Sequence, residues 1–374
     1  MTGANHFHVA LMPGEGIGVE VTAAATAVLE AVEARFGLGF RCETIQGGAL
    51  YYRETGAILP PDGVSRAAAA DAILFGAMGW PDIRLPDGTE IAPQLDLRVA
   101  LDLYAGVRPI RAIPGVPPVL ADPRWAKIDL VIVRESTEGM FASRGVGIVT
   151  DDREARDTQV ITRRTTERLT DFSCRLARRR KQERGTAGRV TLVDKANVFR
   201  SFAFMRKVFH EAAAAHPDIE ARHHYVDAMA LDLVRRPWDF DVLPTENLFG
   251  DILSDLGAGL IGGMGFAPSA DLGDQHGLFQ PSHGSAPDIA GQGIANPAAM
   301  ILSVAMMLDW LGERQGSQDA RLAARAVERS VDGAFGSGSV RSYDIGGRDG
   351  TVAIGRAVAD AVRSGAADKS DRMP

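Results

Sequence analysis

The sequence predicts an α/β protein with a largely parallel sheet and helices on both faces of that sheet. Short apolar runs recur along the chain, and helical stretches separate many of them. Strands that alternate with helices are typical of parallel sheets, because a parallel connection is long enough to hold a helix. A chain of 374 residues, with 45% hydrophobic and 24% charged residues, is long enough for two globular domains or one large one.

The predicted elements begin with a buried strand at 8–12, which Pro13 and Gly14 end. An Ala- and Val-rich helix follows to about Arg35. Further short strands are expected at 72–75, 130–133, 190–193, 224–226 and 241–243. The C-terminal third predicts helices near 296–312, 319–335 and 350–364, the first of them with Asn296 as its cap and Pro297 at its first position.

Three segments depart from this alternation. Two strand-like runs within 145–162 flank Asp151, Asp152 and Arg153 and predict a protruding hairpin. The proline-rich segment 110–119 is the best candidate for a linker. The basic run 178–181 is expected on the solvated face of a helix.

The bulk composition excludes several kinds of partner. A net charge of −7 gives no basic field for nucleic acid or an anionic membrane. No run reaches the roughly 18 apolar residues of a membrane span, and the N-terminus lacks a signal-peptide pattern. Cys42 and Cys174 form no disulfide framework and fit a reducing compartment. We therefore expect a cytoplasmic protein without nucleic-acid or membrane partners.

A glycine-rich loop, PGEGIG at 13–18, follows the first strand and precedes the first helix. Backbone N–H groups in such a loop can face a phosphate. The spacing is not the G-x-G-x-x-G of the usual dinucleotide fingerprint. A phosphate site and a plain tight turn therefore both remain open for Gly14 and its neighbours.

Two aspartates, Asp251 and Asp255, are four residues apart, so a helix would carry both on one face. Like charges at this spacing repel each other, and a divalent cation would offset the repulsion. Oxygen ligands alone suit Mg²⁺ or Mn²⁺. The alternative is an acidic first turn that complements the helix dipole.

Basic residues at strand or loop ends are the candidates for binding an anionic substrate. Arg98, Arg108 and Arg134 could grip carboxylates in bidentate fashion, although surface salt bridges explain any one of them equally well. Lys195 directly follows the strand at 190–193 and could act as a base if its pKa is lowered, or it could simply be exposed and charged. The polar loop HGSAPD at 283–288 could wrap a nucleotide.

Seven motifs, in this order, resemble those of the β-decarboxylating dehydrogenases, which act on 3-isopropylmalate, isocitrate, homoisocitrate and tartrate or D-malate. They are MPGEGIGVEV at 12–21, LRVALDLYAGVRP at 97–109, VRESTEG at 133–139, VDKANV at 193–198, YVDA at 225–228, NLFGDILSDL at 247–256 and HGSAPDIAGQGIANP at 283–297. They span nearly the whole chain, and the resemblance therefore outweighs the structural alternatives given above for each motif.

The resemblance implies the isopropylmalate/isocitrate dehydrogenase-like fold, with two interleaved α/β domains and a cleft between them. Residues 1–103 and 262–374 would form a cofactor-binding domain, and 104–261 a domain for substrate, metal and dimerisation. The family forms homodimers in which the active site is shared across the interface.

The resemblance also assigns roles within that site. It implies that Arg98, Arg108 and Arg134 clamp the substrate, with Gln94 near its distal group, and that Asp251 and Asp255 hold Mg²⁺ or Mn²⁺ with Asp227 of the partner subunit. Lys195, also from the partner subunit, would help to remove the hydroxyl proton. The implied dinucleotide-binding residues are Gly14, Asn197, His283, Gly284, Ser285, Ala286, Asp288 and Asn296. Asp288, where NADP-using relatives carry a lysine, implies NAD⁺, because a carboxylate suits ribose hydroxyls and repels a 2′-phosphate.

The implied activity is the NAD-dependent oxidation, with decarboxylation, of a 3-substituted malate-type diacid, closest to 3-isopropylmalate or to tartrate and D-malate. Three departures from the family pattern bear on this activity, and two of them, at Phe141 and Gln280, leave a regulatory, non-catalytic paralogue as the alternative. Phe141 replaces the tyrosine that protonates the enolate, and Gln280 replaces a glutamate near the nicotinamide ribose. The stretch 92–96 matches neither an isopropylmalate nor an isocitrate site.

Overall fold

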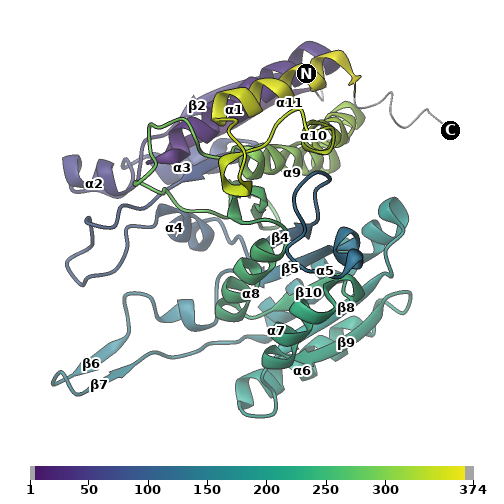
Figure 1. The fold of residues 1–374 in the computed structure, drawn as a ribbon. Coiled ribbons are helices and arrows are strands. Elements are labelled where there is room, and N and C mark those ends of the chain that lie inside the picture. Colours follow the sequence, from purple (N-terminus) through teal and green to yellow (C-terminus); the bar gives the residue numbers. More distant parts are fainter. Residues whose placement is uncertain (1–4, 367–374) are drawn as a thin grey trace. The chain divides into compact units, whose positions relative to one another are not determined.

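The computed structural model describes residues 5–366 and divides into two compact units (Figure 1). The first unit comprises Met1–Leu101, Ile113–Pro118 and Ile261–Pro374, and the second comprises Asp102–Ala112 and Val119–Leu260. Both units combine mostly parallel strands with helices, so the predicted α/β class is confirmed. The roles expected for 1–103 with 262–374 and for 104–261 stay predictions.

The sheet of the first unit has the strand order β2-β1-β3-β12-β11. β1 pairs in parallel with β2 and β3, β3 pairs in parallel with β12, and β12 forms an antiparallel hairpin with β11. Every residue of β3 is buried, as expected for a parallel strand that is covered on both faces. The strands are β1 (His6–Gly14), β2 (Gly39–Thr44), β3 (Ala72–Ala77), β11 (Pro268–Leu272) and β12 (Gly277–Pro281).

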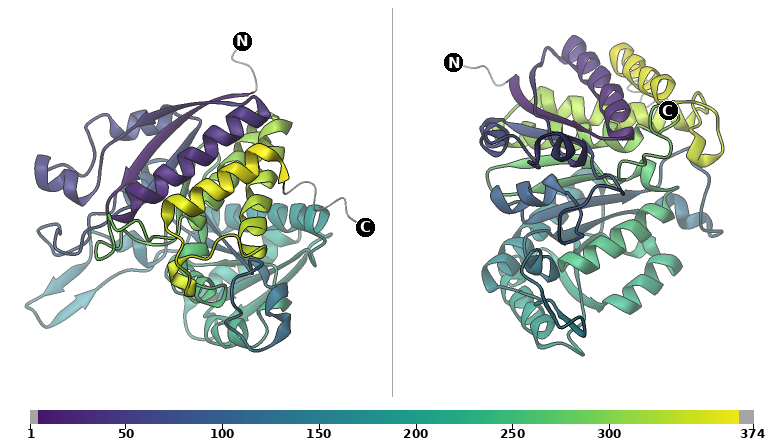
Figure 2. Two further views of the ribbon diagram at one scale, coloured as in Figure 1. Left: turned by 45° about the horizontal axis from the view of Figure 1, so that its top comes forward. Right: turned by 90° about the vertical axis from the view of Figure 1, so that its left-hand side faces the viewer.

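The helices of the first unit include two that lie side by side although they are far apart in sequence, α1 and α11 (Figure 2). Gly355 of α11 permits this close approach, because a Cβ there would lie 2.9 Å from the Cβ of Ala24. The helices are α1 (Ile17–Phe36), α2 (Ala49–Thr55), α3 (Gly63–Ala69), α4 (Pro93–Ala100), α9 (Ala298–Gln315), α10 (Gln318–Gly336) and α11 (Thr351–Ser364).

The second unit has the strand order β4-β5-β10-β8-β9, in which only β4 is antiparallel to its neighbour. The carboxyl ends of the parallel strands β5, β10 and β8 therefore meet at one edge, where polar residues follow each strand. The strands are β4 (Ala105–Arg111), β5 (Asp129–Glu135), β8 (Arg189–Asp194), β9 (Glu220–Tyr225) and β10 (Val242–Thr245). The helices are α5 (Arg163–Arg184), α6 (Arg200–Ala213), α7 (Val226–Arg235) and α8 (Asn247–Leu260).

The predicted hairpin is present and consists of β6 (Ile148–Thr150) and β7 (Glu154–Arg156), which pair in antiparallel fashion. It extends away from the rest of the second unit (Figure 1). Asp151 and Asp152 at its turn both have positive φ, a conformation that aspartate tolerates better than most residues. Within residues 5–366, none of the helices combines the length and the apolar character that a membrane span needs.

Two local predictions are wrong. The segment 110–119 is not wholly a linker, because Ile110 and Arg111 end β4 and pair with β5. The basic run 178–181 is not uniformly solvated, because Arg180 is buried and its Nε lies 2.8 Å from Oδ1 of the buried Asp241. The carboxylate supplies the charge partner that a buried guanidinium needs, and the sequence pattern could not show it.

Candidate active site

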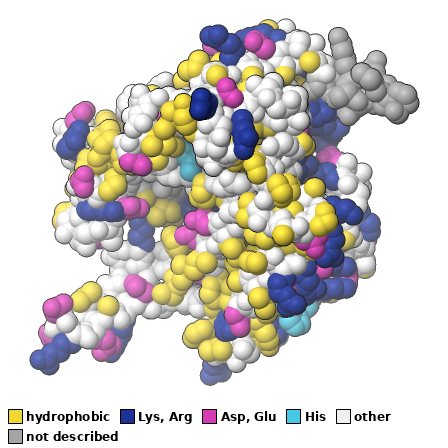
Figure 3. Space-filling view, in the orientation of Figure 1, with side chains coloured by type: hydrophobic (Ala, Val, Ile, Leu, Met, Phe, Trp, Pro, Cys, Tyr) yellow, Lys and Arg dark blue, Asp and Glu magenta, His cyan; other side chains and the backbone are white. Residues whose placement is uncertain are grey.

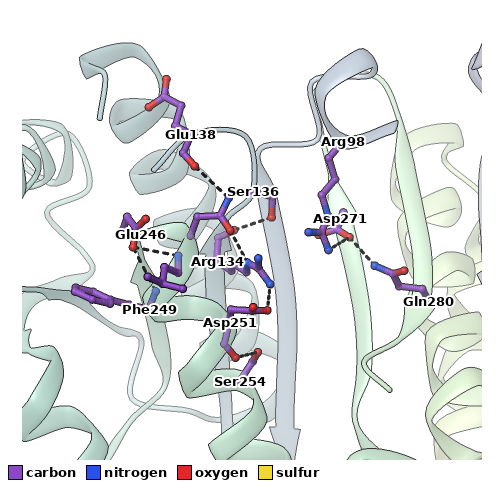
Figure 4. A network of polar contacts seen from close by, with 12 residues as sticks. Arg98, Arg134, Ser136, Glu138, Glu246, Phe249, Asp251, Ser254, Asp271 and Gln280 are labelled. Carbon is purple, nitrogen blue, oxygen red and sulfur yellow. Dashed lines mark hydrogen bonds and ion pairs between the residues drawn. The ribbon is translucent and has the colours of Figure 1, made fainter. Parts of the chain in front are cut away.

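The carboxyl end of β5 presents Arg134, which two side chains of α8 hold in place (Figure 4). Arg134 Nε donates to Asn247 Oδ1 at 2.8 Å, and Nη1 forms an ion pair with Asp251. The close approach of α8 to β5 requires Gly250, because a Cβ there would lie 2.7 Å from the Cβ of Arg134. The guanidinium is therefore buried and oriented by the fold itself.

The predicted carboxylate pair lies on α8, with both side chains on one helix face. The pKa of Asp255 is raised by burial and by the negative charge of Asp251, while Arg108 and Arg134 act in the opposite direction. This second-unit group thus brings together four predicted residues: two arginines for an anionic substrate and two acids for a cation. A bound cation would relieve the crowding of negative charge that raises the pKa of Asp255.

The metal assignment fits this chemistry in part. Asp251 and Asp255 supply carboxylate oxygens, which hard divalent cations prefer. Among residues 5–366, no three acidic, histidine or cysteine side chains lie close enough to hold a metal ion, so Asp227 does not complete the set within one chain. A third protein ligand would have to come from another copy, as the family resemblance implies.

The end of β8 presents Lys195, whose Nζ lies 2.6 Å from Oδ1 of Asp227 in the first turn of α7. This hydrogen bond lowers the pKa of Asp227. The preceding Asp194 is fully buried, accepts the N–H of Ala196 and pairs with Arg206 through both carboxylate oxygens. Asp194 therefore anchors the turn that carries Lys195. The structure brings the predicted Lys195 and Asp227 together.

Two residues that the sequence analysis did not single out organise the loop before α8. Glu246 accepts the N–H groups of Leu248 and Phe249 with Oε2, and that of Met140 with Oε1. Asn247 orients Arg134, as described above. Asn247 is the first residue of the motif NLFGDILSDL, and that position could have identified it from the sequence. Glu246 offered no such signal, because an acid before a helix is too common to single out.

In the first unit, the glycine loop packs against the loop that carries HGSAPD. Ile17 N donates to Ser285 O at 2.8 Å, and a Cβ on Gly16 would lie 2.0 Å from that same oxygen. The N–H of Glu15 donates to Ala77 O at 2.8 Å. These N–H groups already have protein acceptors. Of the two interpretations of the glycine loop, the structure therefore favours a tight turn that packs against the HGSAPD loop, and it does not favour a phosphate site.

The HGSAPD loop retains an acceptor suited to a ligand. His283 Nδ1 donates to Gly284 O at 2.9 Å, and burial lowers the pKa of the ring, which favours its neutral form. Its Nε2 is then a buried acceptor without a partner among the described residues. Asn296 Nδ2 donates to Asp344 Oδ2 at 3.0 Å, which fixes the amide. An oriented amide and an unused acceptor fit a dinucleotide.

Helix α4 carries the remaining residues that the resemblance predicts for substrate binding, Gln94 and Arg98, which lie one turn apart on one face. Arg98 Nη2 lies 2.9 Å from Oδ2 of Asp271, and Gln280 Nε2 donates to that same oxygen at 2.9 Å (Figure 4). The site around Gln280 therefore keeps a negative charge, because the carboxylate of Asp271 lies directly beside the amide. The sequence analysis missed Asp271, and no motif signalled it.

The chain belongs to the isocitrate/isopropylmalate dehydrogenase family, whose model matches residues 8–362. It is therefore a dehydrogenase of the β-decarboxylating class that acts on a hydroxy acid. It is 42% identical to the 3-isopropylmalate/3-methylmalate dehydrogenase of Methanocaldococcus jannaschii, over 95% of this chain and 98% of the relative. It is also 37% identical to the tartrate dehydrogenase/decarboxylase of Pseudomonas putida, over 96% of this chain and 98% of the relative.

Solved structures of this family share the fold. The crystal structure of isocitrate dehydrogenase from Methylococcus capsulatus matches with a TM-score of 0.84 and 36% identity, over 95% of this chain and 99% of that chain. The predicted resemblance to isopropylmalate, isocitrate and tartrate dehydrogenases is thereby confirmed. The cofactor, the metal and the particular hydroxy acid remain matters for proposal.

Proposed function

We propose that the protein oxidises a 3-substituted malate-type diacid with NAD⁺ and a divalent cation, and then decarboxylates the product. The observation that carries this proposal is the second-unit group in which Arg134, held by Asn247, forms an ion pair with Asp251, one acid of the carboxylate pair on α8. A fixed guanidinium beside two acids suits a substrate that presents a carboxylate and a metal-binding hydroxyl together.

The chain's own residues take distinct parts in this reaction. Arg98, Arg108 and Arg134 bind the substrate carboxylates, and their planar guanidinium groups fix its orientation. Lys195 helps to remove the hydroxyl proton once its own proton has left the ammonium, and Asp227, whose Oδ1 lies 2.6 Å from Nζ, holds the amine in position. Asp251 and Asp255, with Asp227 of the partner subunit, would hold Mg²⁺ or Mn²⁺, which would supply Lewis-acid chemistry: a lower pKa for that hydroxyl and a polarised ketone. The HGSAPD loop and Asn296 would hold NAD⁺, which would supply the hydride acceptor.

An unused hydrogen-bond acceptor on α4 narrows the range of groups that the substrate can carry at C3. Gln94 Oε1 is buried and has no partner among the described residues. A hydroxyl on C3, as in tartrate, can donate to it, whereas an isopropyl group would leave it unpaired at a cost of about 1–3 kcal/mol, or roughly 5- to 150-fold in kcat/KM. We therefore favour the tartrate-like end of the family's substrate range over the isopropylmalate end.

The regulatory paralogue remains the second candidate, and its support is now narrower. Gln280 no longer favours it, because the neighbouring Asp271 supplies a negative charge beside the amide. Lys195, Asp227, the α8 acids and the arginines are all present, so Phe141 is the one departure that still favours a non-catalytic chain. NADH formation by the purified protein decides between the two.

This proposal needs a homodimer, because the third metal ligand, Asp227, would come from the partner subunit and not from the chain that carries Asp251 and Asp255. Apolar side chains are exposed on α7 and α8, where Figure 3 shows hydrophobic surface gathering: Leu231, Val234, Leu248 and Ile252. Two inactive variants, Lys195→Ala and Asp251→Asn, test the sharing directly. When the two variants are co-expressed, their heterodimers should regain activity. In each heterodimer both substitutions fall in the same site, so the other site holds no altered residue. Equal inactivity alone and together would contradict a shared site.

The central experiment measures NADH formation with malate, tartrate, isopropylmalate, isocitrate and homoisocitrate, each with and without Mn²⁺. Metal-dependent oxidation with the highest kcat/KM for tartrate or malate is the expected result. A best rate with isopropylmalate would overturn the argument from Gln94 but leave the family activity standing. Inactivity with every diacid, while NAD⁺ still binds, would favour the regulatory paralogue.

A further inference from the structure

A buried polar group joins α4 to the β11–β12 hairpin in the first unit. Asp271 is 0% exposed, Arg98 5% and Gln280 8%. Both Arg98 Nη2 and Gln280 Nε2 contact the same oxygen, Asp271 Oδ2, at 2.9 Å (Figure 4). The carboxylate is thus held from two elements at once, by a charge on the helix and by an amide on the neighbouring strand.

The cost of burying this acid points to a role beyond packing. A buried ion pair is seldom more stable than well-packed apolar residues of the same volume, because both charges lose their hydration. Arg98 also keeps a buried Nε without a partner among the described residues, although the guanidinium is held at Nη2. One N–H of a fixed cation is therefore left for an acceptor that residues 5–366 do not supply.

We propose that Asp271, held by Gln280, is a positioning residue that fixes Arg98 through Nη2 and leaves Nε directed to a substrate carboxylate. The proposal rests on the proposed function, since it takes Arg98 as a substrate ligand. Asp271 acts only through Arg98 and contacts no reacting atom.

The amide at Gln280 is the chemical counterpart of the acid at Asp271. An amide N–H can donate to a carboxylate, whereas a glutamate at 280 would bring a second negative charge to within hydrogen-bonding distance of Asp271. The identities of the two positions are therefore coupled: one acid and one amide fit together, and two acids do not. Exchanging the two groups should preserve the single negative charge beside Arg98.

The test compares two buried ion pairs of the same kind. Asp271→Asn removes the charge that holds Arg98, and Asp241→Asn does the same for Arg180, whose Nε lies 2.8 Å from Asp241. For the best diacid, we expect Asp271→Asn to raise KM about tenfold or more, as loss of a charged hydrogen bond predicts, with kcat changed much less. Asp241→Asn should lower Tm while KM stays within twofold of wild type.

Rescue and binding measurements separate positioning from general destabilisation. The double variant Asp271→Asn/Gln280→Glu restores one carboxylate and should bring KM back to within about threefold of wild type. Calorimetry with succinate, which cannot be oxidised at a hydroxyl, should show the same order of affinities. If Asp271→Asn does not fold, Gln280→Met removes only the amide donor and should raise KM by a smaller factor.

Three results would overturn the proposal. They are an unchanged KM and unchanged succinate affinity in Asp271→Asn, an equal KM increase in Asp241→Asn, and a failure of Gln280→Glu to rescue the folded Asp271→Asn protein. Failure of the proposed function is recognised separately, because wild-type protein would then oxidise none of the diacids while the succinate measurements still report on Arg98.

Discussion

The guanidinium carbon of Arg134 lies 4.9 Å from the ring centroid of Phe141. A cation over an aromatic face is a favourable contact, so the ring helps to hold an arginine that we assign to substrate binding. Phe141 lies in a short 3₁₀ turn, Met140–Ser143, directly after the loop that Glu246 anchors through Met140. The ring is thus placed where the family resemblance expects a phenol.

We predict that Phe141→Tyr raises turnover on the best decarboxylated substrate. The change keeps the ring under Arg134 and adds a group that can protonate an enolate. A positioned general acid is worth roughly 10²- to 10⁴-fold, of which water or Lys195 recovers part in the wild-type protein. Steady-state kcat and KM for the two proteins measure the effect. Unchanged or lower kcat with unchanged KM would show that the missing phenol does not limit the reaction.

Product analysis separates two explanations for Phe141. Release of one CO₂ per NADH from the wild-type protein would show that protonation is rerouted to another donor. Accumulation of an oxo-diacid without CO₂ would show that the physiological substrate is only oxidised. In the second case Phe141→Tyr should leave the NADH rate unchanged for that substrate, because no enolate forms.

We predict that Asp255→Asn stabilises the metal-free protein slightly but weakens metal binding. The pKa of Asp255 is raised by burial and by Asp251, so its charge is unfavourable in the folded state. Removing a like charge four residues away is worth a few tenths of a kcal/mol, whereas losing an anionic ligand removes much of the attraction for Mn²⁺. Thermal unfolding with and without Mn²⁺ checks both signs.

The control for this metal prediction is Asp360→Asn, an exposed acid on α11 whose surface ion pair with Arg363 lies far from α8 in sequence. It should leave the Mn²⁺-induced rise in Tm intact. Full activity of the wild-type protein after exhaustive chelation would refute the metal assignment altogether.

The sequence predicted the elements with strong local patterns and missed contacts between distant segments. The run at 72–75 is uniformly apolar, and all of β3 is buried as expected. Asp251 and Asp255 are four residues apart, so one helix face followed directly from the spacing. Arg180, in contrast, lies in a basic run that looks solvated, and only the fold brings Asp241 to it from 61 residues away.

The candidate site shows the same division. Asp271 and Gln280 are nine residues apart in sequence, but their contact depends on the antiparallel pairing of β11 with β12. Sequence spacing alone does not fix that register, so Gln280 looked like a lost charge rather than a partner for one. The glycine loop was ambiguous for a related reason, because the acceptor of Ile17 N is Ser285, which lies far away in the chain.

We predict that NAD⁺ is preferred over NADP⁺ and that Asp288→Lys reverses or abolishes the preference. Asp288 is exposed, so its carboxylate can accept from ribose hydroxyls and would repel a 2′-phosphate. The ratio of kcat/KM for the two cofactors is the measurement, with Asp274→Lys as an exposed charge-reversal control outside the HGSAPD loop. Equal kcat/KM values in the wild-type protein, or a preference for NADP⁺, would show that Asp288 does not select the cofactor.

We predict that Glu135, at the end of β5, makes the protein less stable as the pH rises from about 4.5 to above 7. Burial, with the nearby charge of Glu138, raises the pKa of Glu135 to about 7, although its carboxylate accepts the N–H and hydroxyl of Thr137. The folded state then holds a proton that the unfolded state has released, so stability is fully present below the unfolded pKa. Up to about 3 kcal/mol is lost as the pH passes the folded pKa.

Urea unfolding of wild type and Glu135→Gln at pH 5 and pH 8 isolates this contribution, because the amide does not titrate. The variant loses one hydrogen-bond acceptor at every pH, so the informative quantity is the change in the difference between the two proteins. That difference should shift in favour of Glu135→Gln at pH 8, and parallel pH profiles would show that Glu135 has the same pKa in the folded and unfolded chains.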